Sequence, residues 1–109
     1  MEQCVRTLPY TINLADSFVK RLKGLKFRKE QLVEEGLWII PCKSIHMCFM
    51  HFAIDAVFLN KEGRIIKTIE GIKPWRFILP IKNAYSVIEL PAGTISKLGL
   101  KTGEMINLQ

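Results

Sequence analysis

Turn-forming residues interrupt the apolar stretches of this chain so often that only short elements are expected. In its second half, proline, glycine and asparagine recur at roughly eight- to twelve-residue intervals, among others at Asn60, Gly63, Pro74, Pro80 and Pro91. The runs between them are rich in β-branched and aromatic residues, which are typical of short strands. The sequence therefore predicts a mainly β fold, a compact antiparallel β-sandwich or barrel of about six to eight short strands.

The most clearly marked pair of strands is a hairpin over residues 54–69. Residues 49–59 form a long apolar run, for which a strand is expected, and residues 65–69 form the returning strand. Gly63 suits the left-handed position of the turn between them. Further strands are expected over residues 4–14 (broken near Pro9), 37–40, 85–90 and 105–108.

One short N-terminal helix is expected over residues 16–23. Asp16 can cap its first turn, and Gly24 accepts the left-handed conformation that commonly ends a helix. A single helical turn is also expected over residues 95–98, ended by Gly99. With these helical segments counted, the fold is α+β by content.

Length and composition favour a single domain spanning residues 1–109. Of its residues 49% are hydrophobic and 24% charged, which is ordinary for a globular protein. Cys4, Cys42 and Cys48 are odd in number and irregularly spaced, which favours a reducing compartment over a disulfide framework. The chain has neither a signal-peptide core near its start nor an apolar run long enough to span a bilayer, so we expect it in the cytoplasm.

Five segments, taken in their order and spacing, are similar to one small prokaryotic family. They are GLKFR (24–28), PCKSIHMCFMHFAIDAVFL (41–59), KPWR (73–76), ELPAGT (89–94) and GLKTGE (99–104). Together they resemble the family catalogued as domain of unknown function number 192. The resemblance implies a compact, mainly β fold with a small helical element, and it implies no catalytic residues. The chain departs from the family pattern at Lys26, Met47 and Glu104, where Met, Thr and Asp are common.

The stretch around residues 42–55 holds several potential zinc ligands, namely Cys42, His46, Cys48, His51 and Asp55. The spacing Cys-x3-His-x-Cys-x2-His matches no common zinc-site pattern. If the stretch is extended, His46 and Cys48 point to one face, and His51 and Asp55 point to the other. We therefore expect no cofactor. The alternative is zinc, in a small metal-assisted enzyme that uses His46, His51 and Asp55.

Two carboxylates, Asp55 and Glu89, interrupt apolar strands. Burying a carboxylate is costly unless it is paired or hydrogen-bonded. One interpretation is acid–base work by the two groups in a cleft, with one pKa raised. The interpretation that we favour is structural: each carboxylate accepts backbone N–H bonds or pairs with an arginine, Arg28 or Arg76.

Basic residues dominate residues 20–29, and the chain as a whole carries a net charge of +6. Such a charge favours encounter with anionic partners, including nucleic acid. Lys73 and Arg76 flank Trp75 in a second mixture of cations and an aromatic ring. The alternative interpretation is a solvated helix face. The candidate nucleic-acid- or anion-binding residues are Lys20, Arg21, Lys23, Lys26, Arg28 and Lys29.

The leading hypothesis is a non-catalytic accessory module that binds a small molecule or a protein partner beside His46 and Trp75. The alternatives are the metal-assisted enzyme and a basic nucleic-acid-binding domain. The strands are apolar and no catalytic set is assembled in the sequence, whereas aromatic and polar residues gather in the loops. The candidate ligand-binding residues are His46, Met47, Asp55, Trp75, Arg76 and Glu89.

Overall fold

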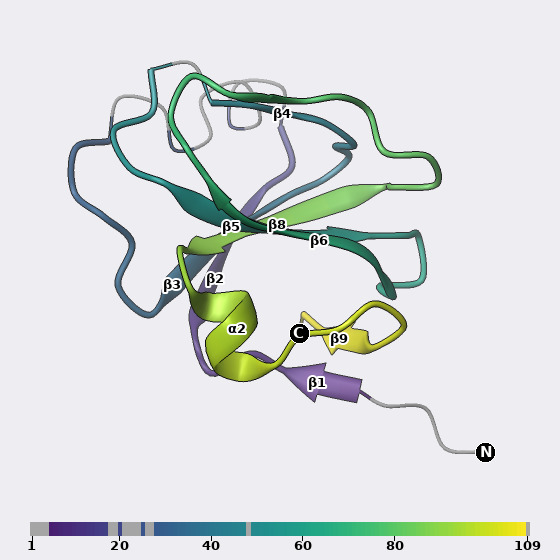
Figure 1. Cartoon of the computed structure of the whole chain (residues 1–109). Coiled ribbons are helices and arrows are strands. Elements are labelled where there is room, and N and C mark those ends of the chain that lie inside the picture. Colours follow the sequence, from purple (N-terminus) through teal and green to yellow (C-terminus); the bar gives the residue numbers. More distant parts are fainter. Residues whose placement is uncertain (1–4, 18–19, 21–24, 26–27, 48, 109) are drawn as a thin grey trace.

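The described part of the chain is organised around a five-stranded sheet (Figure 1). The computed structural model describes residues 5–17, 20, 25, 28–47 and 49–108. A five-residue helix, α2 (Thr94–Leu98), follows the last strand of this sheet. The strands are β1 (Val5–Thr7), β2 (Thr11–Ala15), β3 (Glu35–Ile39), β4 (Ile45–His46), β5 (Ile54–Leu59), β6 (Ile65–Ile72), β7 (Phe77–Ile78), β8 (Ser86–Pro91) and β9 (Met105–Asn107).

The central sheet is mixed and open at both edges. Its order is β2-β3-β8-β5-β6, with β2 parallel to β3 and the other neighbours antiparallel. Outside it, β1 runs parallel to β9, and β4 pairs antiparallel with β7. The expected barrel and the expected purely antiparallel pairing are therefore wrong. Residues 16–34, between β2 and β3, are long enough for the crossover that parallel neighbours need.

Both faces of the central sheet are buried, which explains why β5 and β8 are apolar almost throughout. Phe58 belongs to a cluster on one face, which Ile45 of β4 also joins; we call this the ribbon-side cluster. Val57 belongs to a cluster on the opposite face with Ile95 of α2 and Ile106 of β9, the helix-side cluster. Figure 1 shows β4 on one side of the sheet, with α2, β1 and β9 on the other.

The hairpin predicted over residues 54–69 is confirmed. The Asn60 N–H donates to the Arg64 carbonyl (3.0 Å), and Gly63 takes φ 86° in the turn. The returning strand β6 continues to Ile72, beyond its expected end. The strand expected over residues 49–59 is only partly right: residues 49–53 are not strand, and Phe49 takes φ 64°, which no regular strand contains.

Other local predictions have mixed outcomes. The helical turn ended by Gly99 is confirmed as α2, and the split of the first strands around Pro9 is confirmed by β1 and β2. The N-terminal helix expected over residues 16–23 lies largely outside the described residues. The described part holds nine strands, more than expected, because β4 and β7 are two-residue strands in stretches without a strand pattern. Within these ranges, no helix is long and apolar enough to cross a membrane.

Candidate functional site

A two-stranded ribbon, made of β4 and β7, covers the ribbon-side cluster. Ile45 pairs with Ile78, and His46 pairs with Phe77. Because side chains alternate along a strand, Ile45 is buried beneath the ribbon and Ile78 is half-buried there, while His46 and Phe77 are exposed. The ribbon therefore presents its aromatic side chains outward.

Met47 anchors the end of this ribbon. Its side chain is fully buried in the ribbon-side cluster. Its N–H donates to the Arg76 carbonyl (2.9 Å), and its carbonyl accepts from the Trp75 N–H (2.8 Å). These two bonds hold residues 75 and 76 against residue 47. Met47, a predicted ligand-binding residue, thus supports the surface from below and does not line it.

Phe49 and Trp75 lie in contact beyond Met47. Their ring centroids are 5.1 Å apart with an interplanar angle of 60°. Both residues take a left-handed backbone, with φ 64° and 66°, although bulky side chains are genuine outliers there. About half of each side chain remains exposed, with exposed fractions of 49% for Phe49 and 60% for Trp75. Two strained residues therefore hold two rings outward and together.

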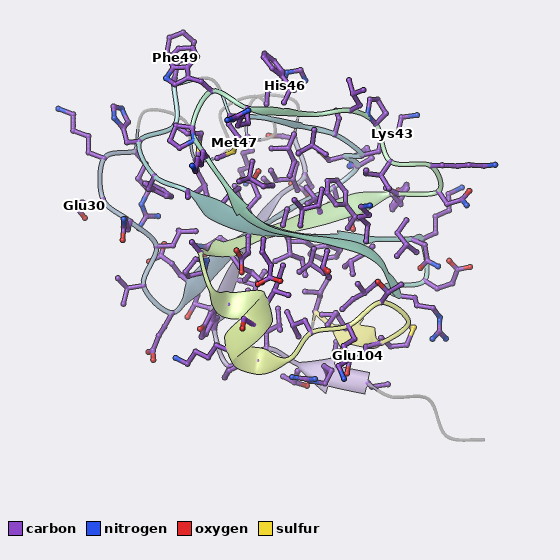
Figure 2. All side chains as sticks on the ribbon, in the orientation of Figure 1. Glu30, Lys43, His46, Met47, Phe49 and Glu104 are labelled. Atoms are coloured by element: carbon purple, nitrogen blue, oxygen red, sulfur yellow. The ribbon has the colours of Figure 1, made fainter. Side chains whose placement is uncertain are left out.

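The second ring contact joins His46 to Phe77, with centroids 5.2 Å apart and planes nearly perpendicular. Phe77 is 59% exposed. We call the four residues His46, Phe49, Trp75 and Phe77 the aromatic platform. Figure 2 shows His46 and Phe49 projecting from the same edge of the molecule, at the end opposite Glu104.

The segments that build the platform carry positive charge only. No Asp or Glu occurs in residues 36–54 or 71–88. The same segments contain Lys43, Lys73 and Arg76, all exposed. Arg76 lies directly between Trp75 and Phe77 in the chain. The platform therefore combines exposed rings with a positive electrostatic potential, which attracts anions.

Asp55 has a structural position away from the platform. Its carboxylate is fully buried and accepts hydrogen bonds from the Gly71 N–H (2.9 Å) and the Ile95 N–H (2.8 Å). Two residues of β6 oppose it in a bulge of the pairing with β5, and Gly71 takes φ 60° there. The carboxylate thus ties β5 to β6 and to α2. The favoured structural interpretation is confirmed for Asp55, through backbone donors and not through an arginine.

Glu89 lies on the opposite face of the sheet from Asp55. In the register between β5 and β8, Asp55 pairs with Leu90 and Ala56 pairs with Glu89. Because Leu90 belongs to the helix-side cluster and Ala56 to the ribbon-side cluster, the two carboxylates point to opposite sides. The structure therefore does not bring Asp55 and Glu89 together in a cleft, and Asp55 lies on the face of the sheet opposite the aromatic platform.

Those potential metal ligands that the structure describes do not converge on one point. Among the described residues, no group of three or more His, Cys, Asp or Glu side chains is arranged to hold a metal ion. His51 is exposed in the loop before β5, and the Cys42 thiol donates to the Ser44 carbonyl (3.0 Å). Cys48 lies outside the described residues. Asp55, with its oxygens bonded to backbone N–H groups on the helix side, is not brought together with His46.

The basic run of residues 20–29 is described only in part. Lys20 and Lys29 are exposed, whereas Arg21, Lys23 and Lys26 lie outside the described residues. Arg28 donates a hydrogen bond to the Glu35 carboxylate (2.7 Å), and this bond lowers the pKa of Glu35 from its ordinary value. Arg28 therefore pairs with Glu35, and of the two alternatives given for Asp55 the structure has the backbone N–H bonds and not the arginine.

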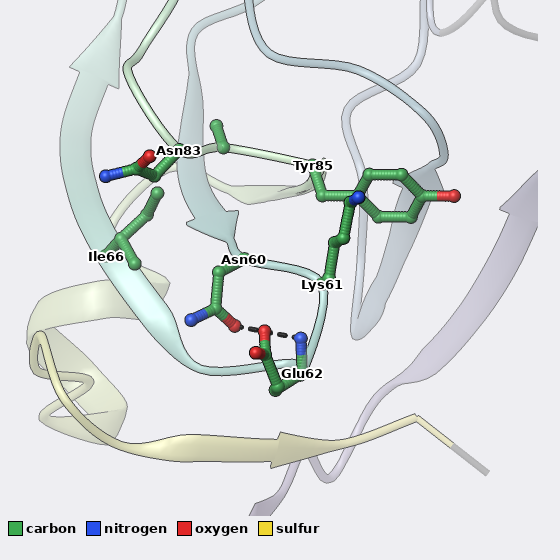
Figure 3. A pocket seen from close by; sticks show the side chains of 7 residues that line it. Asn60, Lys61, Glu62, Ile66, Asn83 and Tyr85 are labelled. Carbon is green, nitrogen blue, oxygen red and sulfur yellow. Dashed lines mark hydrogen bonds between the residues drawn. The ribbon is translucent and has the colours of Figure 1, made fainter.

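A second surface feature is a hollow beside the β5–β6 turn (Figure 3). Its volume is about 450 Å³. The Lys61 ammonium lies 5.8 Å from the centroid of the Tyr85 ring. The Asn60 side-chain oxygen accepts from the N–H groups of Glu62 and Arg64 and is thus used by the turn. The lining residues are Asn60, Lys61, Glu62, Ile66, Asn83, Ala84 and Tyr85.

Sequence reasoning found part of the platform and missed two of its residues. His46, Trp75 and Arg76 were predicted and do lie together. Phe49 was assigned to a buried strand, and Phe77 was not singled out. The alternation of Trp75, Phe77 and Leu79 along residues 75–79 was the available signal for an outward-facing row, and Leu79 is indeed 79% exposed.

Comparison with known proteins agrees with this geometry at the level of family and fold. The model of the family domain of unknown function number 192, described as an uncharacterized ACR, matches residues 2–108. The chain belongs to this family. A UPF0127 protein of Pyrococcus furiosus is 35% identical over 100 residues, which cover 87% of this chain and 84% of that protein. A UPF0127 protein of Thermococcus sibiricus is 34% identical over 102 residues, 88% of this chain and 64% of that protein.

A solved structure of another protein is similar in fold. It is the crystal structure of a protein of unknown function from Novosphingobium aromaticivorans, which superposes with a TM-score of 0.78 at 25% sequence identity. The match covers 88% of this chain and 73% of that one. The mainly β fold expected from the resemblance to domain of unknown function number 192 is thereby confirmed.

Proposed function

We propose that this protein is a non-catalytic binding module whose aromatic platform contacts an anionic partner. The observation that carries the proposal is the contact between Phe49 and Trp75. A sparsely populated backbone conformation costs about 1–3 kcal/mol per residue, and such strain gathers at functional sites. Here the strain does not bury the rings fully, because about half of Phe49 and more than half of Trp75 remain exposed.

The charges around the platform indicate the sign of the partner. Lys43, Lys73 and Arg76 are exposed, and their two segments contain no carboxylate. Complementary charge speeds encounter and disfavours like-charged partners. Two copies of this chain that met through their platforms would bring cations to face cations. An anionic partner therefore suits this surface better than a second copy does.

The placement of the titratable groups favours binding over chemistry. Asp55 and Glu89 are buried on opposite faces of the central sheet, and Asp55 is bonded to backbone N–H groups. Within the platform itself, His46 is the titratable side chain. A general acid or base must lie within hydrogen-bond reach of the proton that it transfers, and the four platform residues place no second titratable group beside His46.

The experiment uses the two tryptophans of the chain as separate reporters. Protein labelled with 5-fluorotryptophan gives a fluorine NMR signal from Trp75 in the platform and another from Trp38, which packs against the helix-side cluster. Four anionic probes are added in turn: a short heparin fragment, poly-L-glutamate, phosphatidylglycerol vesicles and an oligonucleotide. We expect at least one of them to shift the Trp75 signal and leave the Trp38 signal in place.

A matched pair of charge reversals locates the binding surface. Arg76→Glu changes the charge between the platform residues Trp75 and Phe77, and Lys97→Glu makes the same change on α2, on the other side of the central sheet (Figure 1). We expect Arg76→Glu to abolish the Trp75 shift and Lys97→Glu to preserve it. The proposal would be overturned if the two charge reversals changed the Trp75 shift equally, or if none of the four probes shifted the Trp75 signal.

A further inference from the structure

From the chemistry of the platform we infer that the anionic partner is a single-stranded nucleic acid. This inference rests on the proposed function and names the partner class. Four exposed side chains on this surface carry aromatic rings, held on two neighbouring segments of chain. Proteins that bind single strands combine rings on which bases stack with cations that follow the phosphates.

The rings form two pairs that follow one another along the ribbon. The His46–Phe77 pair is followed, across the hydrogen bonds of Met47, by the Phe49–Trp75 pair. More than half of the Trp75 and Phe77 side chains is open to solvent, so ring surface remains free beside each edge contact. Each of the two ring pairs can therefore stack with one of two neighbouring bases.

Three exposed cations flank the rings along the two segments. Arg76 stands between Trp75 and Phe77, and Lys73 precedes Trp75 by two residues. Lys43 precedes β4 on the other side of the ribbon. For single strands, the logarithm of affinity falls with the logarithm of salt concentration with a slope of about −0.7 per neutralised phosphate. Three contacts therefore predict a slope of roughly −2.

The same geometry disfavours a duplex, and Leu79 distinguishes stacking from insertion into a lipid surface. In a duplex the base faces are stacked on one another, so exposed rings find no free face to cover. A lipid surface is held by insertion of apolar side chains among anionic headgroups, and for that purpose Leu79, the most exposed side chain of this row, is as valuable as a ring. Stacking instead requires the rings and leaves Leu79 without a role.

The test measures the anisotropy of labelled oligonucleotides of about ten nucleotides, a length within the range that one small domain covers. Oligouridylate and oligothymidylate separate RNA from DNA as the source of the single strand. We expect both to bind at least about tenfold more tightly than a duplex of the same length. We also expect a salt slope of roughly −2, which Arg76→Ala reduces by about 0.7.

Paired substitutions separate stacking from apolar contact. Trp75→Ala and Phe77→Ala should each weaken oligonucleotide binding at least about fivefold, the effect expected for one stacked base. Leu79→Ala, a comparably exposed position, should leave it unchanged. The folded state of each variant is checked by circular dichroism and by the fluorine signal of Trp38.

Four outcomes would overturn the inference. Duplex binding as tight as single-strand binding, or a Leu79→Ala loss equal to that of Trp75→Ala, removes the stacking argument. A Trp75 signal that responds to vesicles, heparin or poly-L-glutamate but not to oligonucleotides also rejects it, and leaves the proposed function standing. A Trp75 signal that none of the four probes shifts rejects both the inference and the proposed function.

Discussion

Phe49 and Trp75 touch through their rings while both backbones are left-handed. A glycine at position 75 adopts such a backbone without strain, so Trp75→Gly relieves about 1–3 kcal/mol of strain. It loses a ring contact worth about 0.5–1.5 kcal/mol and adds chain entropy to the unfolded state. We expect the free energy of unfolding in urea to stay within about 1 kcal/mol of the parent value, while binding at the platform is lost.

Phe58→Ala is the reference for an aromatic ring that serves packing. Phe58 is fully buried in the ribbon-side cluster, and its truncation should cost about 3–5 kcal/mol. If Trp75→Gly proved as costly as Phe58→Ala, Trp75 would be a packing residue and the argument from strain would fail.

Asp55→Ala leaves two backbone donors without an acceptor, one of them buried. The Gly71 and Ile95 N–H groups both donate to this carboxylate, and a buried donor left unpaired, as Ile95 would be, costs about 1–3 kcal/mol. We expect the variant to lose at least about 1–3 kcal/mol of unfolding free energy, with faster hydrogen exchange at the amides of residues 71 and 95. Asp55→Asn should recover little, because its NH2 group opposes one of the two donors.

Glu62→Ala provides the comparison for Asp55. Glu62 lies exposed in the β5–β6 turn, where a surface substitution changes stability by about 0.5 kcal/mol or less. An Asp55→Ala variant with the melting temperature of Glu62→Ala would contradict the tying role of the Asp55 carboxylate.

The predictions that succeeded depended on signals local to the chain. Gly63 and Gly99 marked a turn and a helix end because each position takes a positive φ, which a glycine adopts without steric cost. The β5–β6 hairpin needed only neighbouring residues. The placement of Asp55 and Glu89 on opposite faces needed the register of β5 against β8, which joins strands far apart in sequence and leaves no mark on either one.

The platform was only partly predictable for the same reason. β4 and β7 have two residues each and pair across some thirty residues of chain, so neither shows a strand pattern of its own. Phe49 stands in an apolar run that favours a strand, but the turn after Met47 overrides that preference. A sequence pattern reports average tendencies, whereas left-handed aromatic residues depend on tertiary hydrogen bonds such as that from Trp75 to Met47.

Gly36→Ala should crowd the contact between β3 and its neighbours. A Cβ atom at this position would lie 2.7 Å from Leu90 Cδ2 and 3.0 Å from both the Glu89 carbonyl oxygen and Ile12 Cδ1. Overpacking of this kind costs about 1–3 kcal/mol. We expect that loss in urea unfolding, with partial recovery when Leu90→Val is added, because the two changes meet in space. Simple additivity of the two losses would show that the Leu90 contact is not the cause.

The Arg28–Glu35 pair should give the protein a small acid-dependent loss of stability. The hydrogen bond from Arg28 lowers the pKa of Glu35 in the folded state. Its stabilisation is therefore present above the unfolded-state pKa, about 4.3, and is lost as the pH falls through the lowered folded-state value. Because both side chains are about one-third exposed, the contribution should not exceed about 1 kcal/mol.

Glu35→Gln isolates this contribution, because glutamine does not titrate. The loss of unfolding free energy between neutral pH and about pH 3, measured in urea, should be smaller in Glu35→Gln than in the parent protein. High salt should reduce the difference at neutral pH, since an exposed pair is screened. Glu62→Gln serves as control, because Glu62 is exposed at the tip of the β5–β6 turn. If the two variants lost the same stability on acidification, the bond from Arg28 would not be the source of the pH dependence.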